Sequence, residues 1–203
     1  MRLCLVTDRT QTRDRDLIAV VGECLAAGLP AVQVREKDLP AAEIARLCRS
    51  LRPLTAARGA LLIVNDRVDI ALAAGADGVQ RTSTSLSVED MRSAADKRVR
   101  IGASVHSLDE AVAAGNAGAE WLFFGPVYDT PSKRRYGPPQ GLTALERVAA
   151  AVAVPVVAIG GVTPERVSEV RAAGARGVAA ISAILSADSP AAATRRFLDA
   201  LGD

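Results

Sequence analysis

Short apolar runs rich in Val, Ile and Leu alternate along the chain with Ala-, Glu- and Arg-rich stretches whose apolar residues recur at helical spacing. The apolar runs predict eight strands, at residues 2–7, 31–35, 60–64, 77–80, 99–105, 120–124, 154–159 and 177–181. The stretches that follow them predict eight helices, at residues 14–28, 40–57, 67–74, 87–96, 107–117, 142–152, 164–173 and 189–201. The chain therefore reads as consecutive β/α units.

Apolar strands that alternate with helices indicate a parallel sheet covered by helices, and eight such units favour an α/β fold closed as a compact (β/α)8 TIM barrel. An open doubly wound sheet is the alternative. A chain of 203 residues is long enough to bury a large core, and we expect a single TIM-barrel domain over residues 1–203. The connection at 125–141 is unusually long for such a fold, which is typical of a functional loop.

Composition narrows the class of protein. Hydrophobic residues make up 49% of the chain and charged residues 24%, which excludes a disordered chain. The 25 Lys and Arg nearly balance the 23 Asp and Glu, which argues against a nucleic-acid partner. No apolar run approaches the roughly 20 residues that span a membrane. Cys4, Cys24 and Cys48 form no close pair, so we expect buried thiols and a cytoplasmic location.

Polar and cationic residues stand at the predicted carboxyl ends of the strands, where a TIM barrel has its active site. The candidates on the first half of this rim are Gln33, Arg35, Lys37, Asn65, Asp66, Ser104 and His106. The candidates on the second half are Thr130, Ser132, Lys133, Gly160, Gly161, Ile181 and Ser182. Forked and point cations, hydroxyls and a glycine pair that exposes backbone N–H groups predict an anion site for a phosphorylated small molecule.

His106 is the only histidine, and its position at the end of a strand makes it a candidate general acid or base. The alternative is a hydrogen-bonding residue at the start of the next helix, which Ser107 would cap. Tyr128 and Tyr136 lie in the 125–141 connection, where they could cover a heteroaromatic ligand.

Seven short motifs carry a resemblance to a known family. They are Val32–Lys37, Val64–Asp69, Ala76–Val79, Ser104–Ser107, Thr130–Lys133, Val157–Gly161 and Ile181–Ile184. In this order, over nearly the whole chain, they resemble the thiamine phosphate synthase/TenI superfamily. The resemblance implies a compact (β/α)8 barrel and a phosphorylated thiazole as ligand. The family often forms dimers, so a homodimer is one expected state.

Synthases of this family join hydroxymethylpyrimidine pyrophosphate to thiazole phosphate with magnesium. The resemblance implies that one set of residues binds pyrophosphate: Arg35, Lys37, Asn65, Ser104 and Lys133. Asp66 would bind the metal. A second set would hold the thiazole phosphate: Thr130, Ser132, Gly161 and Ser182. Cations and a metal suit this reaction, because the departing pyrophosphate carries negative charge.

One departure from the synthase pattern shifts the prediction. Ser85 stands where synthases usually carry the aspartate that is their second magnesium ligand, and a hydroxyl is a poor replacement for a carboxylate on a hard cation. Glu89 and Asp90 follow closely but look like first-turn helix residues. We therefore favour the TenI-type branch and predict a thiazole tautomerase, an isomerase without a cofactor that aromatises a carboxythiazole phosphate by proton transfer through His106.

Two alternatives remain open from the sequence. The first is thiamine phosphate synthase, a transferase in which Asp66 holds magnesium. The second is a non-catalytic regulatory or ligand-sensing protein on the same scaffold, because TenI proteins have carried a regulator label.

Overall fold

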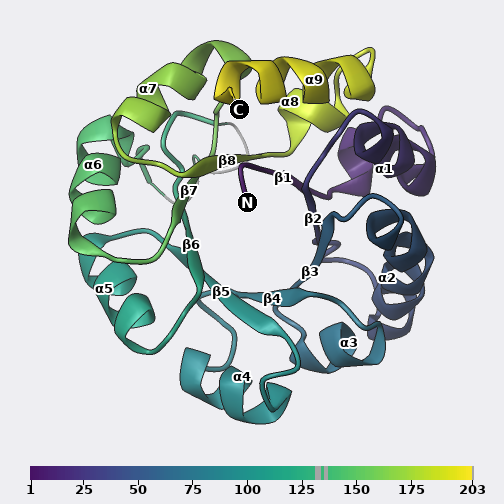
Figure 1. Cartoon of the computed structure of the whole chain (residues 1–203), viewed down its shortest axis with the longest axis horizontal. Coiled ribbons are helices and arrows are strands. Elements are labelled where there is room, and N and C mark those ends of the chain that lie inside the picture. The colour runs from purple at the N-terminus through teal and green to yellow at the C-terminus, as the bar shows by residue number, and fades with distance from the viewer. Residues whose placement is uncertain (131–133, 135–136, 203) are drawn as a thin grey trace.

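A computed structural model describes residues 1–130, 134 and 137–202. Its strands are β1 (Leu3–Val6), β2 (Ala31–Val34), β3 (Leu61–Asn65), β4 (Gly78–Arg81), β5 (Arg100–Val105), β6 (Trp121–Phe124), β7 (Val156–Ile159) and β8 (Gly177–Ala180). Each strand pairs in parallel with the next, and β8 pairs with β1, so the sheet closes. Figure 1 shows the ring of strands with the helices outside it. The predicted TIM barrel is confirmed, and the open doubly wound sheet is excluded.

Each predicted helix is present, with bounds that differ by a few residues. The helices are α1 (Leu17–Ala26), α2 (Ala41–Ala56), α3 (Val68–Ala73), α4 (Val88–Ala95), α5 (Leu108–Asn116), α6 (Gly141–Ala151), α7 (Val167–Ala172) and α9 (Pro190–Leu201). Among the described residues, the short elements η1 (Arg9–Gln11, a 3-10 helix) and α8 (Ser182–Leu185) were not predicted, and the first turn of the helix predicted at 164–173 is the 3-10 helix η3 (Pro164–Arg166). Elements this short have no hydrophobic period to detect. Within the described part of the chain, no helix is both long and apolar enough to cross a membrane.

The barrel has two apolar layers because successive residues of a strand face opposite sides of the sheet. Residues of one parity pack against the surrounding helices in the larger core. Residues of the other parity fill the barrel: Cys4, Val6, Ala31, Ile63, Trp121, Phe123, Val157 and Ala179. Gln33, Asn65, Gln80 and Ser104 share this inner parity, so the strands direct them to the inside of the barrel.

The three cysteines are free thiols buried in these layers. Burial raises the pKa of Cys4 to about 12 and that of Cys48 to about 11, so both stay protonated near neutral pH. The prediction that the three cysteines are buried thiols is confirmed.

Trp121 lies inside the barrel, below the carboxyl-terminal rim, and its ring packs against β4 and β5. A Cβ atom at Gly102 would lie 2.1 Å from the Trp121 Nε1 and Cε2 atoms, and one at Gly78 would lie 2.8 Å from Cη2. Real Cβ atoms do not approach other heavy atoms this closely. The two glycines are therefore present to make room for the indole ring.

We expect Gly102→Ala to lower the free energy of unfolding by about 1–3 kcal/mol, the usual cost of overpacking a filled core. Urea denaturation followed by circular dichroism measures the change. Gly115→Ala is the matched control: a Cβ at Gly115, in α5, meets nothing within 4 Å, and alanine should stabilise the helix by about 0.5–1 kcal/mol. Equal effects of the two substitutions would show that the indole does not occupy this space.

Candidate functional site

Polar side chains from neighbouring strands join at the carboxyl end of the barrel. Gln33 is buried at the end of β2, and its Nε2 donates to Asn65 Oδ1 at 3.0 Å. On β4, Gln80 Nε2 donates to Ser104 Oγ at 3.1 Å, at the end of β5. The structure thus places Gln33, Asn65 and Ser104 on adjacent parts of one rim, as the sequence predicted.

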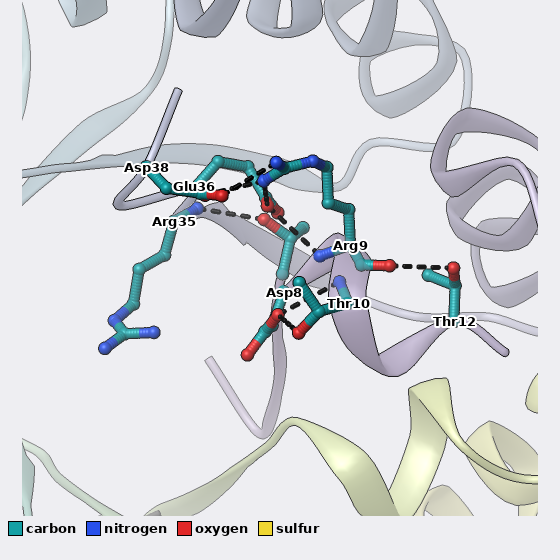
Figure 2. Close-up of polar contacts among 8 residues, drawn as sticks. Asp8, Arg9, Thr10, Thr12, Arg35, Glu36 and Asp38 are labelled. Carbon is teal, nitrogen blue, oxygen red and sulfur yellow. Dashed lines mark hydrogen bonds and ion pairs between the residues drawn. The ribbon is translucent and has the colours of Figure 1, made fainter. Parts of the chain in front are cut away.

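The segment after β2 carries Arg35 and Lys37 and is tied to the segment after β1. The Arg35 backbone N–H donates to Thr7 Oγ1 at 2.9 Å. The Glu36 carboxylate, only 2% exposed, accepts hydrogen bonds from the Arg9 backbone N–H at 3.1 Å and from Arg9 Nη1 at 3.5 Å. Figure 2 shows these contacts, with the Arg35 side chain extending away from Arg9. Glu36 therefore anchors the chain between the two predicted phosphate-binding cations.

Arg9 also holds Asp38, through two hydrogen bonds of 2.6 and 2.7 Å from its Nη1 and Nη2 atoms (Figure 2). The hydrogen bonds from Arg9 hold the pKa of Asp38 below its ordinary value, and Asp38 in turn raises the pKa of Arg9. Glu36 Oε1 has no hydrogen-bond partner among the described residues. Arg9 thus pairs with both acidic residues that flank Lys37 and offsets one of their two negative charges, so this segment as a whole keeps a net positive charge.

Asp66 and Ser85 meet on the neighbouring side of the rim. Asp66 follows β3 in a left-handed conformation, with φ of 68°. The Ser85 hydroxyl donates to Asp66 Oδ1 and accepts from the Thr82 backbone N–H at 2.8 Å. The turn after β4 therefore brings Ser85 to the carboxylate. A carboxylate oxygen suits a hard cation such as Mg²⁺, and the Ser85 hydroxyl places a neutral oxygen beside it.

Glu89 and Asp90 do not join this pair. Both are exposed in the first turn of α4, as predicted, where Ser87 caps the helix and bonds to Asp90. Acidic residues at a helix start interact with the helix dipole, which accounts for them without a ligand.

His106 is exposed at the end of β5 and binds the protein backbone. Its Nδ1 lies 2.5 Å from the Gly125 carbonyl oxygen, which can only accept, so Nδ1 carries the proton. Ser107 Oγ accepts from the Glu110 backbone N–H at 3.1 Å and caps α5. The imidazole thus connects the end of β5 to the start of the long connection.

The loops after β7 and β8 complete the rim. Gly160 and Gly161 have φ of 93° and 66°. A Cβ at Gly160 would lie 2.5 Å from Pro126 Cβ, and one at Gly161 would lie 2.8 Å from Tyr128 Cβ. Only glycine therefore fits both the backbone and the space at these positions.

After β8, the half-buried Ile181 precedes α8, and Ser182 is the first, exposed residue of that short helix. A short extra helix beside the loops after strands seven and eight is the usual phosphate site of this barrel type. Thr130 is half-buried. Ser132, Lys133 and Tyr136 lie outside the described residues.

Tyr128 is engaged within the protein. Its hydroxyl donates to Glu169 Oε2 at 2.7 Å, and the Arg166 guanidinium lies 4.3 Å from the ring centroid. Burial, together with Glu169, raises the pKa of Tyr128 to about 12, so the hydroxyl stays protonated. Arg166 Nη1 also donates to the Gly161 carbonyl at 2.8 Å. The pair therefore ties the long connection to the loop after β7, rather than leaving the Tyr128 ring open to a ligand.

The sequence did not reveal Thr7, Arg9, Gln80, Trp121 or Arg166 as residues that support the site. Four of them act on other site residues through contacts with distant parts of the chain, which spacing does not show. Gln80 had a detectable signal, because it is a polar residue of inner parity within an apolar strand.

We expect Arg9→Met to weaken the binding of inorganic pyrophosphate, with magnesium present, by about tenfold. The freed Glu36 and Asp38 carboxylates would then compete with the anion for Arg35 and Lys37. Isothermal titration calorimetry measures the affinity. Arg13→Met is the matched control, because Arg13 forms an exposed ion pair with Asp188, and it should change the affinity less than about twofold.

Acid unfolding of the Arg9→Met variant supplies a second measurement. Arg9 lowers the pKa of Asp38, so the pair stabilises the fold above the ordinary aspartate value of 3.8, and this stabilisation is lost as pH falls through the lowered pKa. Arg9→Met should therefore lose less stability than the unmodified protein below that pH. Identical acid profiles would contradict the role given to Arg9.

Named relatives match this chain over almost all of its length. A thiamine-phosphate synthase from Roseiflexus castenholzii is 43% identical over 96% of this chain and 86% of its own. One from Methanoculleus marisnigri is 42% identical over 97% of this chain and 93% of its own. The solved thiamine phosphate pyrophosphorylase from Pyrococcus furiosus superposes with a TM-score of 0.91 at 37% identity, covering 98% and 95% of the two chains.

These relatives overturn the prediction of a thiazole tautomerase, an isomerase that acts through His106 without a metal. That prediction treated the missing carboxylate at Ser85 as the loss of a metal site. The structure instead places the Ser85 hydroxyl on Asp66. Mg²⁺ is usually held by one or two carboxylates together with water and substrate phosphates, so one carboxylate is enough to keep such a site.

The family model described as thiamine monophosphate synthase matches residues 3–184, which include all eight strands of the barrel. The chain belongs to the thiamine monophosphate synthase family.

Proposed function

We propose that this chain is a thiamine phosphate synthase, a transferase that joins hydroxymethylpyrimidine pyrophosphate to thiazole phosphate and releases pyrophosphate. The observation that carries the proposal is the Asp66–Ser85 pair, which lies on the same rim as the Arg35–Lys37 segment and the Gly160–Gly161 loop. A candidate metal site and two candidate anion sites at one end of the barrel would suit a reaction between two phosphorylated substrates. The names of the relatives point to the same reaction.

The pyrophosphate group would bind on the side of β2 to β5. Arg35 and Lys37 supply positive charge, and Asn65 and Ser104 supply neutral hydrogen bonds, with Lys133 as a further cation. Gln33 lies beneath Asn65 and fixes its amide. Donors held in place before the reaction stabilise negative charge as it develops, at little cost of reorganisation. These residues would therefore favour cleavage of the bond between the pyrimidine methylene carbon and the pyrophosphate oxygen.

Asp66 and Ser85 fit magnesium by the chemistry of their oxygens. Asp66 would bind the ion directly, and the adjacent Ser85 hydroxyl would orient the carboxylate or contribute a neutral oxygen. When bound, magnesium neutralises charge on the pyrophosphate and makes it a better leaving group.

The thiazole phosphate would bind on the side of β6 to β8. The residues proposed for it are Thr130, Ser132, Gly160, Gly161, Ile181 and Ser182. Arg166 holds the Gly161 carbonyl, so the peptide that carries the next N–H group has a fixed orientation. His106 positions the start of the long connection through Gly125, between the two proposed anion sites.

An assay with purified protein and both substrates tests the proposal. We expect thiamine phosphate to form only with magnesium and to disappear with EDTA, as followed by NMR. Asp66→Asn should lower kcat/KM by about 100-fold, because the amide removes the anionic metal ligand. Asp69→Asn is the matched control, since Asp69 pairs with Arg67 at the start of α3, and it should keep the activity within about twofold.

Formation of thiamine phosphate in excess EDTA would contradict the role of Asp66. No product under any condition, together with binding of both phosphorylated substrates, would instead leave the ligand-sensing alternative.

Ser85→Asp tests the geometry of the metal site. A second carboxylate beside Asp66 should lower the magnesium concentration for half-maximal activity by about tenfold, because affinity rises with the charge of the ligands. Without the metal, the two carboxylates repel each other, so EDTA should lower the melting temperature of this variant more than that of the unmodified protein. Ser83→Asp, exposed in the same turn, is the control and should change neither property.

A further inference from the structure

Three residues of the barrel interior form a chain of hydrogen bonds beneath the proposed pyrophosphate site. Strand register pairs Gln80 with Gly102 and Gly102 with Trp121. Because Gly102 has no side chain, the indole ring extends across its place, and Trp121 Nε1 reaches Gln80 Oε1 at 2.7 Å. Gln80 is fully buried and Trp121 is 7% exposed. The link is therefore shielded from water.

The direction of each hydrogen bond in this chain follows from its first member. An indole N–H can only donate, so the atom of Gln80 that faces Trp121 must be the carbonyl oxygen. The opposite atom, Gln80 Nε2, can only donate, and it lies 3.1 Å from Ser104 Oγ. Ser104 must accept this bond, so its single O–H proton points to a different acceptor.

We infer that Trp121 and Gln80 are positioning residues that fix the Ser104 hydroxyl as a hydrogen-bond donor toward pyrophosphate. This inference rests on the proposed function, because it takes pyrophosphate as the ligand of Ser104. The oxygens of ionised pyrophosphate can only accept hydrogen bonds. A hydroxyl that already donates its proton to a protein group could not donate to them. The hydrogen bond from Gln80 occupies an acceptor position of the Ser104 oxygen and leaves the Ser104 O–H group available to donate to pyrophosphate.

The neighbouring strands repeat this arrangement. Gln33 Nε2 donates to Asn65 Oδ1, so Asn65 uses its carbonyl oxygen within the barrel and keeps its N–H groups as donors. Asn65 on β3 and Ser104 on β5, the two strands on either side of β4, thus each receive a hydrogen bond from a glutamine nearer the barrel interior and keep their donors for the rim. A site built in this way favours anions over cations before any charged side chain takes part.

Three variants separate the effect of hydrogen-bond direction at Ser104 from the effect of side-chain packing at Gln80. Gln80→Glu keeps an acceptor oxygen for the Trp121 N–H group. When ionised, the new carboxylate cannot donate to Ser104, so the Ser104 hydroxyl must donate its proton to the carboxylate. Gln80→Leu keeps most of the volume and leaves the Ser104 proton free to rotate. Ser104→Ala removes the hydroxyl itself. The affinity of each protein for inorganic pyrophosphate with magnesium is measured by calorimetry, and circular dichroism checks folding.

We expect Gln80→Glu to weaken binding by about 10- to 100-fold, the range for losing one hydrogen bond to a charged group, and Gln80→Leu to weaken it by less than about fivefold. In the Ser104→Ala background, Gln80→Glu should have almost no further effect. A residue that only supports the fold would affect both backgrounds equally. Equal losses in both backgrounds, or a loss for Leu as large as for Glu, would overturn the inference.

Trp121→Phe keeps the test usable if Gln80→Glu does not fold. Without the N–H group the Gln80 amide can reverse and accept from Ser104, so binding should weaken several-fold, and only when Ser104 is present. Unchanged binding in this variant would overturn the inference.

Pyrophosphate binding requires no turnover, so the two proposals fail separately. Coupling between Gln80 and Ser104 without any synthase activity would remove the proposed reaction and keep the inference. Thiamine phosphate formation without this coupling would remove the inference alone. An unmodified protein that binds no pyrophosphate would overturn the inference as well.

Discussion

The strands of this barrel are four to six residues long, so only two or three side chains from each can face the interior. Those few positions must supply both an apolar filling and the floor of a binding site. The two kinds of residue occupy different levels along the barrel axis. Apolar residues such as Ala31 and Ile63 fill the lower part, and polar residues such as Gln33 and Asn65 follow at the carboxyl ends. The depth at which this change occurs sets how deep a ligand can enter.

Trp121 is the place where the two parts are connected. Its ring contributes to the apolar filling, while its N–H group supplies the lowest hydrogen bond of the polar layer. A side chain of this size fits only because Gly78 and Gly102 have no side chains in the space that the ring occupies. Packing below the rim therefore determines which groups the rim can offer above, and a change in the core can alter binding without touching the ligand.

The segments of the rim are held in a different way, by polar contacts between neighbouring loops. Arg9 joins the segments after β1 and β2, and Arg166 with Tyr128 joins the long connection to the loop after β7. Such contacts are partly exposed and contribute little to global stability. Their effect is on position, since a carboxylate held by one arginine cannot neutralise the cations intended for a substrate. Binding and stability can therefore respond separately to substitutions in these loops.

The sequence predicted the barrel because each strand and each long helix carries its own local pattern, and it predicted the rim because strand ends converge in this fold. Contacts between distant residues were not predictable in this way. Arg9 and Asp38 are separated along the chain, and nothing in their spacing indicates that they pair. The short helix α8 was not predicted either, because its four residues are too few for a hydrophobic period, although Ser182 itself was a candidate.

The error over the tautomerase has a physical cause of the same kind. Ser85 was judged by its own chemistry as a ligand, whereas a metal site depends on the whole donor set, including oxygens that the substrate and water bring. The turn that presents Ser85 to Asp66 is intact, with Thr82 fixing the hydroxyl from behind. Ser85 therefore acts on Asp66 as a neutral hydrogen-bond donor, a role that its chemistry as a direct ligand does not describe.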